Sequence, residues 1–230
     1  MDFLNPDTPL GPIVENLKQI RSPSCRMCLQ GPPGTGKTSF GHWLSEQLDR
    51  PLHTKRASDL VSPFVGMTER FMARAFSDAM NVHAILMIDE VDSFLQRRDR
   101  AVRLWEVSAV NEMLSQMESF DGIFVASTNF ADHLDEASLR RFDLKIRFDY
   151  LTSTQKVQLF TRYCSHLGLE RPTHQLLEQT AELHPLTPGD FGNVARQHRF
   201  RSFATPTDFL NALEGECAVK ASRMGRKLGF

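Results

Sequence analysis

A glycine-rich run near the start of the chain carries the clearest chemical signature. It matches the P-loop pattern G-x-x-x-x-G-K-[ST] and consists of Gly31, Pro32, Pro33, Gly34, Thr35, Gly36, Lys37 and Thr38. Glycines allow consecutive backbone N–H groups to turn around a phosphate, and the N-terminus of a following helix adds the positive end of its dipole. Lys37 would reach the terminal phosphates of a nucleotide, the Thr38 hydroxyl would bind Mg²⁺, and Ser39 would complete the phosphate-binding segment. A glycine- and proline-rich turn that matches by chance is the alternative.

A pair of acidic residues ends a continuous apolar segment. Residues 84–88 read Ala-Ile-Leu-Met-Ile, which is typical of a strand buried on both faces of a parallel sheet, and Asp89 and Glu90 follow directly. The carboxyl ends of such strands are where an open α/β sheet binds its ligand. Asp89 is therefore predicted to bind Mg²⁺, and Glu90 to orient or deprotonate an attacking water. A capped strand end with solvated acids is the alternative.

A polar side chain also follows the next apolar segment. Residues 123–127 are predicted to form a strand, and Thr128 and Asn129 come after it. Asn129 would hydrogen-bond either the attacking water or the γ-phosphate. A simple turn residue is the alternative.

The composition limits the class of protein. The 230 residues are 41% hydrophobic and 24% charged with a net charge of −1, as in an ordinary globular protein without a global attraction to nucleic acid or membranes. No apolar run approaches the roughly 20 residues of a membrane span, and the first residues do not resemble a signal peptide, so we expect a cytoplasmic location. Cys25 and Cys28 form a C-x-x-C pair, but without a second pair we expect buried thiols and neither zinc nor a disulfide.

The pattern of predicted elements changes near residue 150. Before it, apolar patterns predict strands at 26–30, 84–88, 123–127 and 144–148, and a polar strand is predicted at 52–56. These strands alternate with helices predicted at 13–20, 37–49, 69–80 and 105–119. After it, only helices are predicted, at 152–167, 173–183, 188–203 and 206–223. The third of these begins like a capped helix, with Thr187 at the N-cap and Pro188 at the first helical position. We therefore expect two parts, residues 1–150 and 151–230.

Taken in order, these segments resemble an ATPase module of the classical AAA clade within the AAA+ superfamily. Residues 31–38 are similar to the family's P-loop, residues 58–69 to its pore-loop segment, and residues 85–92 to its Walker B motif. Asn129 corresponds to its sensor 1, and residues 135–143 to its arginine-finger region.

The resemblance implies a fold, a ligand and an assembly. The fold would be an αβα core with a five-stranded parallel sheet and a helical lid, binding ATP and Mg²⁺ between them. The assembly would be a ring of identical subunits, usually six, in which an arginine acts on ATP held by the neighbour. Family members pull a polypeptide through the central pore, and Phe64, Val65 and Gly66 would face that pore here.

Two positions depart from the family pattern. Arg140 and Arg141 are adjacent, without the usual intervening Pro-Gly, and we favour Arg141 as the finger, with Arg140 as second candidate. The structural alternative is a solvated pair of arginines or a salt bridge to Asp135 or Asp143. The lid turn at residues 187–191 has no sensor-2 arginine, and Arg196 is expected to have a surface or intersubunit role.

Three functions are compatible with such a module. The leading hypothesis is remodelling or unfolding of protein substrates through the pore, and the second is a nucleotide-gated assembly switch that controls a partner protein. The third is action on nucleic acid through the basic residues of 97–103 and of the lid, which the neutral net charge disfavours. Because no substrate-recruiting domain precedes the module, we expect a C-terminal fragment of a longer bacterial-type protein, or dependence on an adaptor.

Overall fold

The computed structural model describes residues 2–64, 66–92, 104–129 and 136–226. Contacts between Cα atoms divide the chain into two compact units. We call Pro6–Gly31 with Lys37–Phe148 the sheet unit, and Met1–Asn5 with Pro32–Gly36 and Asp149–Phe230 the helical unit. The ends of the P-loop therefore belong to the sheet unit, whereas its tip belongs to the helical unit.

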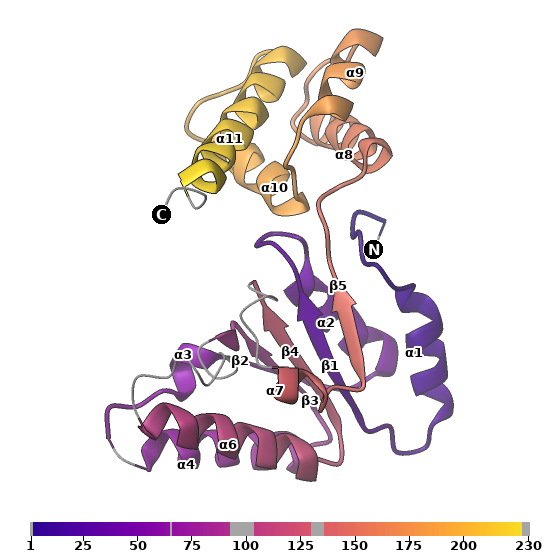
Figure 1. Cartoon of the computed structure of the whole chain (residues 1–230). Helices are drawn as coiled ribbons and strands as arrows, with labels where there is room; N and C mark the ends of the chain where they lie inside the picture. The colour runs from indigo at the N-terminus through magenta and orange to yellow at the C-terminus, as the bar shows by residue number, and fades with distance from the viewer. Residues whose placement is uncertain (1, 65, 93–103, 130–135, 227–230) are drawn as a thin grey trace. The chain divides into compact units, whose positions relative to one another are not determined.

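The sheet unit contains five parallel strands in the order β2-β3-β4-β1-β5 (Figure 1). In chain order they are β1 (Cys25–Gln30), β2 (Leu52–Arg56), β3 (Ile85–Asp89), β4 (Ile123–Thr128) and β5 (Leu144–Arg147). This arrangement confirms the predicted α/β class with a five-stranded parallel sheet. Gln30 is paired with Thr128, and Ile88 with Ala126, so the carboxyl ends of β1, β3 and β4 lie together at one edge.

Helices cover both faces of this sheet. They are α1 (Leu10–Gln19), α2 (Lys37–Leu48), α3 (Ala57–Leu60), α4 (Met67–Asn81), α6 (Leu104–Ser119) and α7 (Glu136–Leu139). Side chains of α4 and α6 pack with Leu86, Ile88 and Phe124 in one core. On the opposite face α2 lies so close that a Cβ on Gly41 would be 2.5 Å from the Met87 sulfur.

Two details of the 58–80 region correct the sequence prediction. Residues 57–60 form the short helix α3, which was not among the predicted helices. The apolar spacing of residues 71–79 predicts that Phe71 lies on the buried face of α4, but Phe71 is 37% exposed. The buried residues Met72, Ala75, Phe76 and Ala79 follow the i, i+3, i+4, i+7 spacing, and Phe71 lies about 100° away from the first of them.

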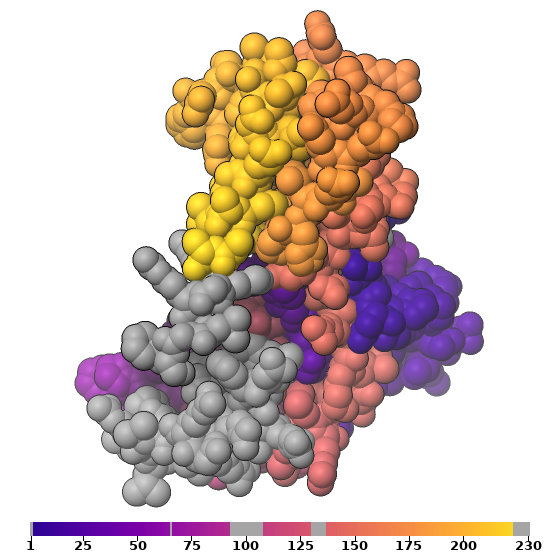
Figure 2. All heavy atoms as spheres, turned by 45° about the horizontal axis from the view of Figure 1, so that its top comes forward, coloured from indigo at the N-terminus to yellow at the C-terminus, as the bar shows by residue number. Residues whose placement is uncertain are grey.

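The helical unit contains α8 (Ser153–His166), α9 (His174–Glu182), α10 (Pro188–Gln197) and α11 (Pro206–Arg226). Phe160, Phe191 and Phe209 form the centre of its core, and the rings of Phe160 and Phe209 stack with centroids 5.4 Å apart. In the space-filling view α11 (yellow) lies beside α9 (orange) over a continuous surface (Figure 2).

The start of α10 follows the prediction, with Thr187 at the N-cap and Pro188 at the first position, but its end does not. The helix ends at Gln197 and not at residue 203, because the chain turns there and returns Phe203 to the core. The Phe203 backbone N–H donates to His198 Nδ1 at 2.9 Å, which fixes that turn.

All four cysteines are buried, including Cys28, which is fully buried in β1. Among the residues that the structure describes, no helix has the length and apolar character needed to cross a membrane.

Candidate functional site

Four of the predicted site residues meet at the carboxyl edge of the sheet. Lys37 Nζ, at the start of α2, donates to Gly31 O at 2.7 Å and to Asn129 Oδ1 at 2.9 Å. Thr38 Oγ1 donates to Asp89 Oδ2 at 3.1 Å. Segments that follow β1, β3 and β4 are thus joined by side-chain hydrogen bonds at one point, as parallel strands allow.

Two hydroxyl groups from the end of β4 hold the acidic residues in place. Ser127 Oγ donates to Asp89 Oδ1, which also accepts from the Glu90 backbone N–H at 3.2 Å. Thr128 Oγ1 donates to Asp92 Oδ1. Both hydroxyl-bearing residues are buried, and sequence reasoning did not assign them a role. The signal that could have identified them is a pair of hydroxyl residues at the end of an apolar strand.

Burial changes the acidity of Lys37. Its side chain is enclosed at the sheet edge, and the resulting loss of solvation lowers its pKa from 10.5 to about 8. The carboxylates of Asp89, Asp92 and Glu90 act in the opposite direction without cancelling this effect. A negatively charged ligand beside Lys37 would raise its pKa again.

Glu90 differs from Asp89 in both backbone and exposure. Its φ of 60° is in the left-handed region, which costs a non-glycine residue roughly 1–2 kcal/mol. The turn is closed by the Val91 backbone N–H, which donates to Ser127 O at 3.0 Å. The Asp89 carboxylate therefore accepts hydrogen bonds from Thr38 and Ser127, whereas the Glu90 side chain is exposed to solvent.

The P-loop has a conformation that only glycine permits at key positions. Gly31 has φ 139°, and a Cβ there would lie 2.0 Å from Phe148 O. Gly34 and Gly36 also have positive φ, and Thr35 Oγ1 donates to Pro32 O at 2.8 Å. Such a turn directs backbone N–H groups inward and fits a phosphate group.

The oxygen atoms of Thr38 and Asp89 fit Mg²⁺. This cation is usually held by one or two carboxylates, with water and phosphate oxygens completing its shell. Within the described ranges, no three His, Cys, Asp or Glu side chains gather into a metal-binding cluster.

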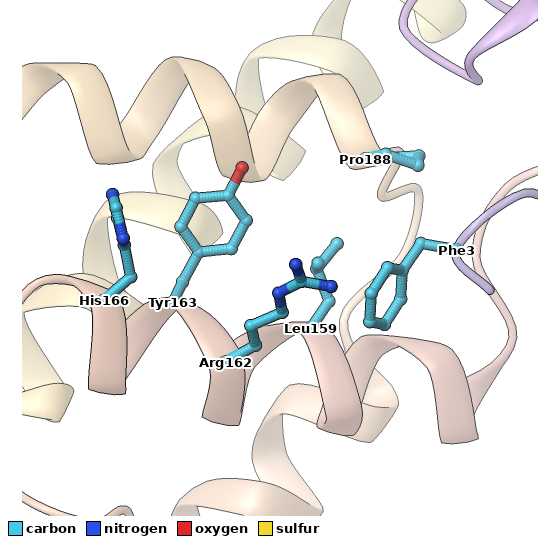
Figure 3. Close-up of a pocket in the computed structure, with 6 residues that line it drawn as sticks. All are labelled: Phe3, Leu159, Arg162, Tyr163, His166 and Pro188. Atoms are coloured by element: carbon cyan, nitrogen blue, oxygen red, sulfur yellow. The ribbon is translucent and has the colours of Figure 1, made fainter. Parts of the chain in front are cut away.

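A separate cavity of about 380 Å³ lies in the helical unit (Figure 3). Its walls are Phe3, Leu159, Arg162, Tyr163, His166 and Pro188. Four of these side chains come from α8, and Phe3 comes from the N-terminal arm, where the Arg162 guanidinium lies 5.7 Å from its ring centroid. Sequence reasoning missed this cavity because the α8 residues have the spacing of any amphipathic helix.

The two candidate finger arginines have different surroundings. Arg141 Nη1 pairs with Glu118 Oε1 near the end of α6, whereas Arg140 is exposed. The suggested pairing of Arg141 with Asp143 is wrong, because Asp143 Oδ2 instead accepts from the Arg26 backbone N–H at 2.8 Å. Asp135 lies outside the described residues.

The predicted pore-loop aromatic is presented to solvent. Phe64 is 73% exposed, so it does not pack beneath its own loop. Its backbone N–H donates to Ser62 Oγ at 3.3 Å, and the Ser62 N–H donates to Thr68 Oγ1 at 3.0 Å, which fixes the turn. Gly66 has φ 77° at the start of α4, while Val65 lies outside the described residues.

The remaining basic candidates lie apart from this site in the sequence. Arg196 donates within α10 to Asn193 Oδ1 and is exposed, as are Arg199 and Arg201. The basic stretch 97–103 lies outside the described residues.

Comparisons with known proteins give a consistent result. The protease "ATP-dependent zinc metalloprotease FtsH 3" of Phytoplasma mali is 30% identical over 203 residues, which cover 81% of this chain and 34% of that protein. "Fidgetin-like protein 1" of Caenorhabditis briggsae is 28% identical over 186 residues, covering 77% of this chain and 31% of that protein. The chain thus spans about a third of the length of these curated relatives.

A solved structure has the same fold. The "Crystal structure of FIGL-1 AAA domain in complex with ADP" has a TM-score of 0.67 and 24% identity, and the match covers 89% of this chain and 80% of that one. The profile of the family described as "ATPase family associated with various cellular activities (AAA)" matches residues 27–150, more than half of the chain. The chain therefore belongs to the AAA family of ATPases.

Proposed function

We propose that this module binds ATP at the carboxyl edge of the sheet and hydrolyses it to ADP and phosphate. The observation that carries the proposal is the meeting of Lys37, Thr38, Asp89 and Asn129 through direct hydrogen bonds. A lysine, a hydroxyl, a carboxylate and an amide are the groups that bind phosphate, coordinate Mg²⁺ and orient water.

Each residue then has a distinct task. The backbone of residues 31–39 surrounds the phosphates, and the Lys37 ammonium exchanges its bonds to Gly31 O and Asn129 Oδ1 for phosphate oxygens. Mg²⁺, when bound to Thr38 and Asp89, neutralises charge on the terminal phosphates. The Asn129 amide, once released, orients the attacking water. The oxygen of this water bonds to the γ-phosphorus as the bond between the γ-phosphorus and the β–γ bridging oxygen breaks. Glu90 accepts the proton that the water loses.

The cavity in the helical unit is suited to the base of the nucleotide. Its volume of about 380 Å³ is in the usual range for small-molecule sites, and Tyr163 offers an aromatic face for stacking. The P-loop tip belongs to the same unit, where the Gly189 backbone N–H donates to Gly34 O at 2.9 Å, and Pro188 lines the cavity. The base of a bound nucleotide is therefore proposed to stack on Tyr163.

Catalysis is completed by an arginine from a neighbouring subunit in a homo-oligomeric ring, usually of six. An arginine supplied in this way is worth about 10³–10⁵ in rate in related phosphoryl-transfer enzymes. Arg141 is the leading candidate, and it must exchange its ion pair with Glu118 for the γ-phosphate of the neighbour.

The test is ATP turnover per subunit as a function of protein concentration, for the wild type, Arg141→Ala and Arg140→Ala. We expect turnover to rise with concentration and to fall at least about 100-fold in Arg141→Ala while ATP affinity is unchanged. If turnover falls only in Arg140→Ala, Arg140 and not Arg141 is the arginine finger. Turnover that is independent of concentration in all three proteins would contradict catalysis across subunits.

The output of hydrolysis is proposed to be remodelling of a protein substrate gripped by Phe64. An aromatic side chain that is 73% exposed on a hydrogen-bonded turn is suited to grip an extended polypeptide without sequence preference. Phe64→Ala should keep ATP turnover and lose unfolding of a tagged fluorescent protein. Phe71→Ala, at a partly exposed phenylalanine on α4, is the matched control. Unfolding that survives Phe64→Ala would exclude this role.

A further inference from the structure

We propose that Lys220, on α11, is a positioning residue for the P-loop. It acts through the first turn of α10, which touches the P-loop tip directly. The inference rests on the proposed binding of ATP to this P-loop, and it assigns to the last helix a part in that binding.

A single carboxylate oxygen joins α11 to α10. Asp190 Oδ2 accepts from the Thr187 backbone N–H at 2.7 Å, from Thr187 Oγ1 at 2.8 Å and from Lys220 Nζ at 2.5 Å. The carboxylate is nearly enclosed, since the Asp190 side chain is only 6% exposed, and the Lys220 side chain is 24% exposed. Figure 1 shows the C-terminal half of α11 beside α10, as this ion pair requires.

The same turn of α10 touches the P-loop tip without intervening side chains. The Gly189 N–H donates to Gly34 O at 2.9 Å, and a Cβ on Gly189 would lie 2.8 Å from Gly34 Cα. A Cβ on Gly34 would lie 2.8 Å from Thr187 Oγ1. Two glycines are therefore needed for this approach, and the position of Thr187 limits where the P-loop tip can lie.

The charge of Lys220 is what stabilises this arrangement. A buried carboxylate is costly unless it is paired and hydrogen-bonded, and removal of one partner from such a pair leaves an uncompensated charge. Without Lys220, the Asp190 carboxylate is better solvated if it turns toward water. That rotation breaks its hydrogen bonds to Thr187. The first turn of α10 then loosens, and with it the contact between Gly189 and Gly34.

The test compares Lys220→Met with Lys220→Arg and Lys156→Met. Lys156 is a buried lysine in the same unit whose Nζ donates to Ala181 O at 2.6 Å and to Leu183 O at 2.8 Å, so it controls for lost stability. ADP affinity is measured by calorimetry below the unfolding transition of every variant. Hydrogen exchange of the Gly189 amide reports on the contact itself.

We expect Lys220→Met to bind ADP roughly tenfold more weakly, because a small displacement of a binding group is costly, and to exchange the Gly189 amide at least tenfold faster. Lys220→Arg should keep most of the ADP affinity and most of the protection of the Gly189 amide. Lys156→Met should change these two quantities only as far as it lowers global stability. Wild-type affinity and exchange in Lys220→Met, or equal losses in Lys156→Met at equal stability, would overturn the inference.

A Lys37→Ala variant separates this inference from the proposed function. Suppose that the wild type binds ADP, that Lys37→Ala does not bind it, and that Lys220→Met binds it with wild-type affinity. In that case only the positioning role of Lys220 fails. If the wild type itself binds no nucleotide, the proposed function fails and the inference with it.

Discussion

The sheet edge and the cavity of the helical unit are built in opposite ways. At the sheet edge, buried and half-buried polar side chains are already bonded to one another, as Lys37 is to Asn129 and Thr38 to Asp89. The cavity is a wall of aromatic, aliphatic and basic side chains around about 380 Å³ of space. Fixed charges give strong, directional binding, whereas the aromatic and aliphatic surface of the cavity contributes binding energy in proportion to the area that a ligand covers. We therefore expect affinity to come mainly from the first region and base selectivity from the second.

The largest effect is expected from Lys37→Met. Loss of the ammonium should weaken binding of both ADP and tripolyphosphate by at least about 100-fold, because one partner of a buried charge pair is removed. The nucleotide-free variant should unfold at the same temperature as the wild type or higher, since burial of the ammonium is unfavourable. Calorimetric titration and thermal unfolding measure the two quantities. ADP affinity within threefold of the wild type would contradict the assignment.

A smaller and more selective effect is expected from Tyr163→Leu. Loss of the ring should weaken ADP binding roughly tenfold, which is the usual worth of stacking a base on an aromatic side chain. Tripolyphosphate, which has no base, should bind as it does to the wild type, and Tyr163→Phe should retain ADP affinity. Equal weakening of both ligands would show that the cavity does not bind the base.

The smallest effect is a proton taken up on binding. Because the pKa of Lys37 is about 8 in the nucleotide-free protein and phosphate raises it, ADP binding should take up roughly half a proton at pH 8 and nearly one at pH 9. Calorimetry in buffers of different ionisation enthalpy measures this uptake. Zero uptake at both pH values would contradict the lowered pKa.

The same pKa has a consequence for stability. The folded value of about 8 lies below the unfolded value of 10.5, so the unfolded chain binds more protons between these pH values. The contribution of Lys37 to stability therefore improves as pH rises through this window and is least favourable below pH 8. Lys37→Met should lack this pH dependence.

The sequence predicted structure best at positions where a local function allows few residue types. The glycines of the P-loop and the apolar run before Asp89 each need a particular residue at a particular spacing, so the strands and the residues of the sheet edge were predicted. Four of the five parallel strands followed from apolar runs, whereas β2 has a polar sequence and is partly exposed.

Features that depend on distant contacts were not predicted. Ser127 acquires its role only when β4 pairs beside β3, and Arg141 meets Glu118 only after α6 and the segment after α7 are in place. The wall of the cavity needs α8 and Phe3 together. The end of α10 was not predicted because it depends on a hydrogen bond from the Phe203 backbone N–H to His198 Nδ1. Apolar periodicity does not reveal such a side-chain bond.

The central claim, ATP hydrolysis at the sheet edge, is tested most directly with Glu90→Gln. ATP affinity by calorimetry and steady-state release of phosphate should be measured at the same protein concentration. We predict affinity within about twofold of the wild type and turnover reduced at least about 100-fold, because the amide keeps the shape of the side chain but cannot accept the proton of water. Turnover close to the wild-type rate would contradict the account.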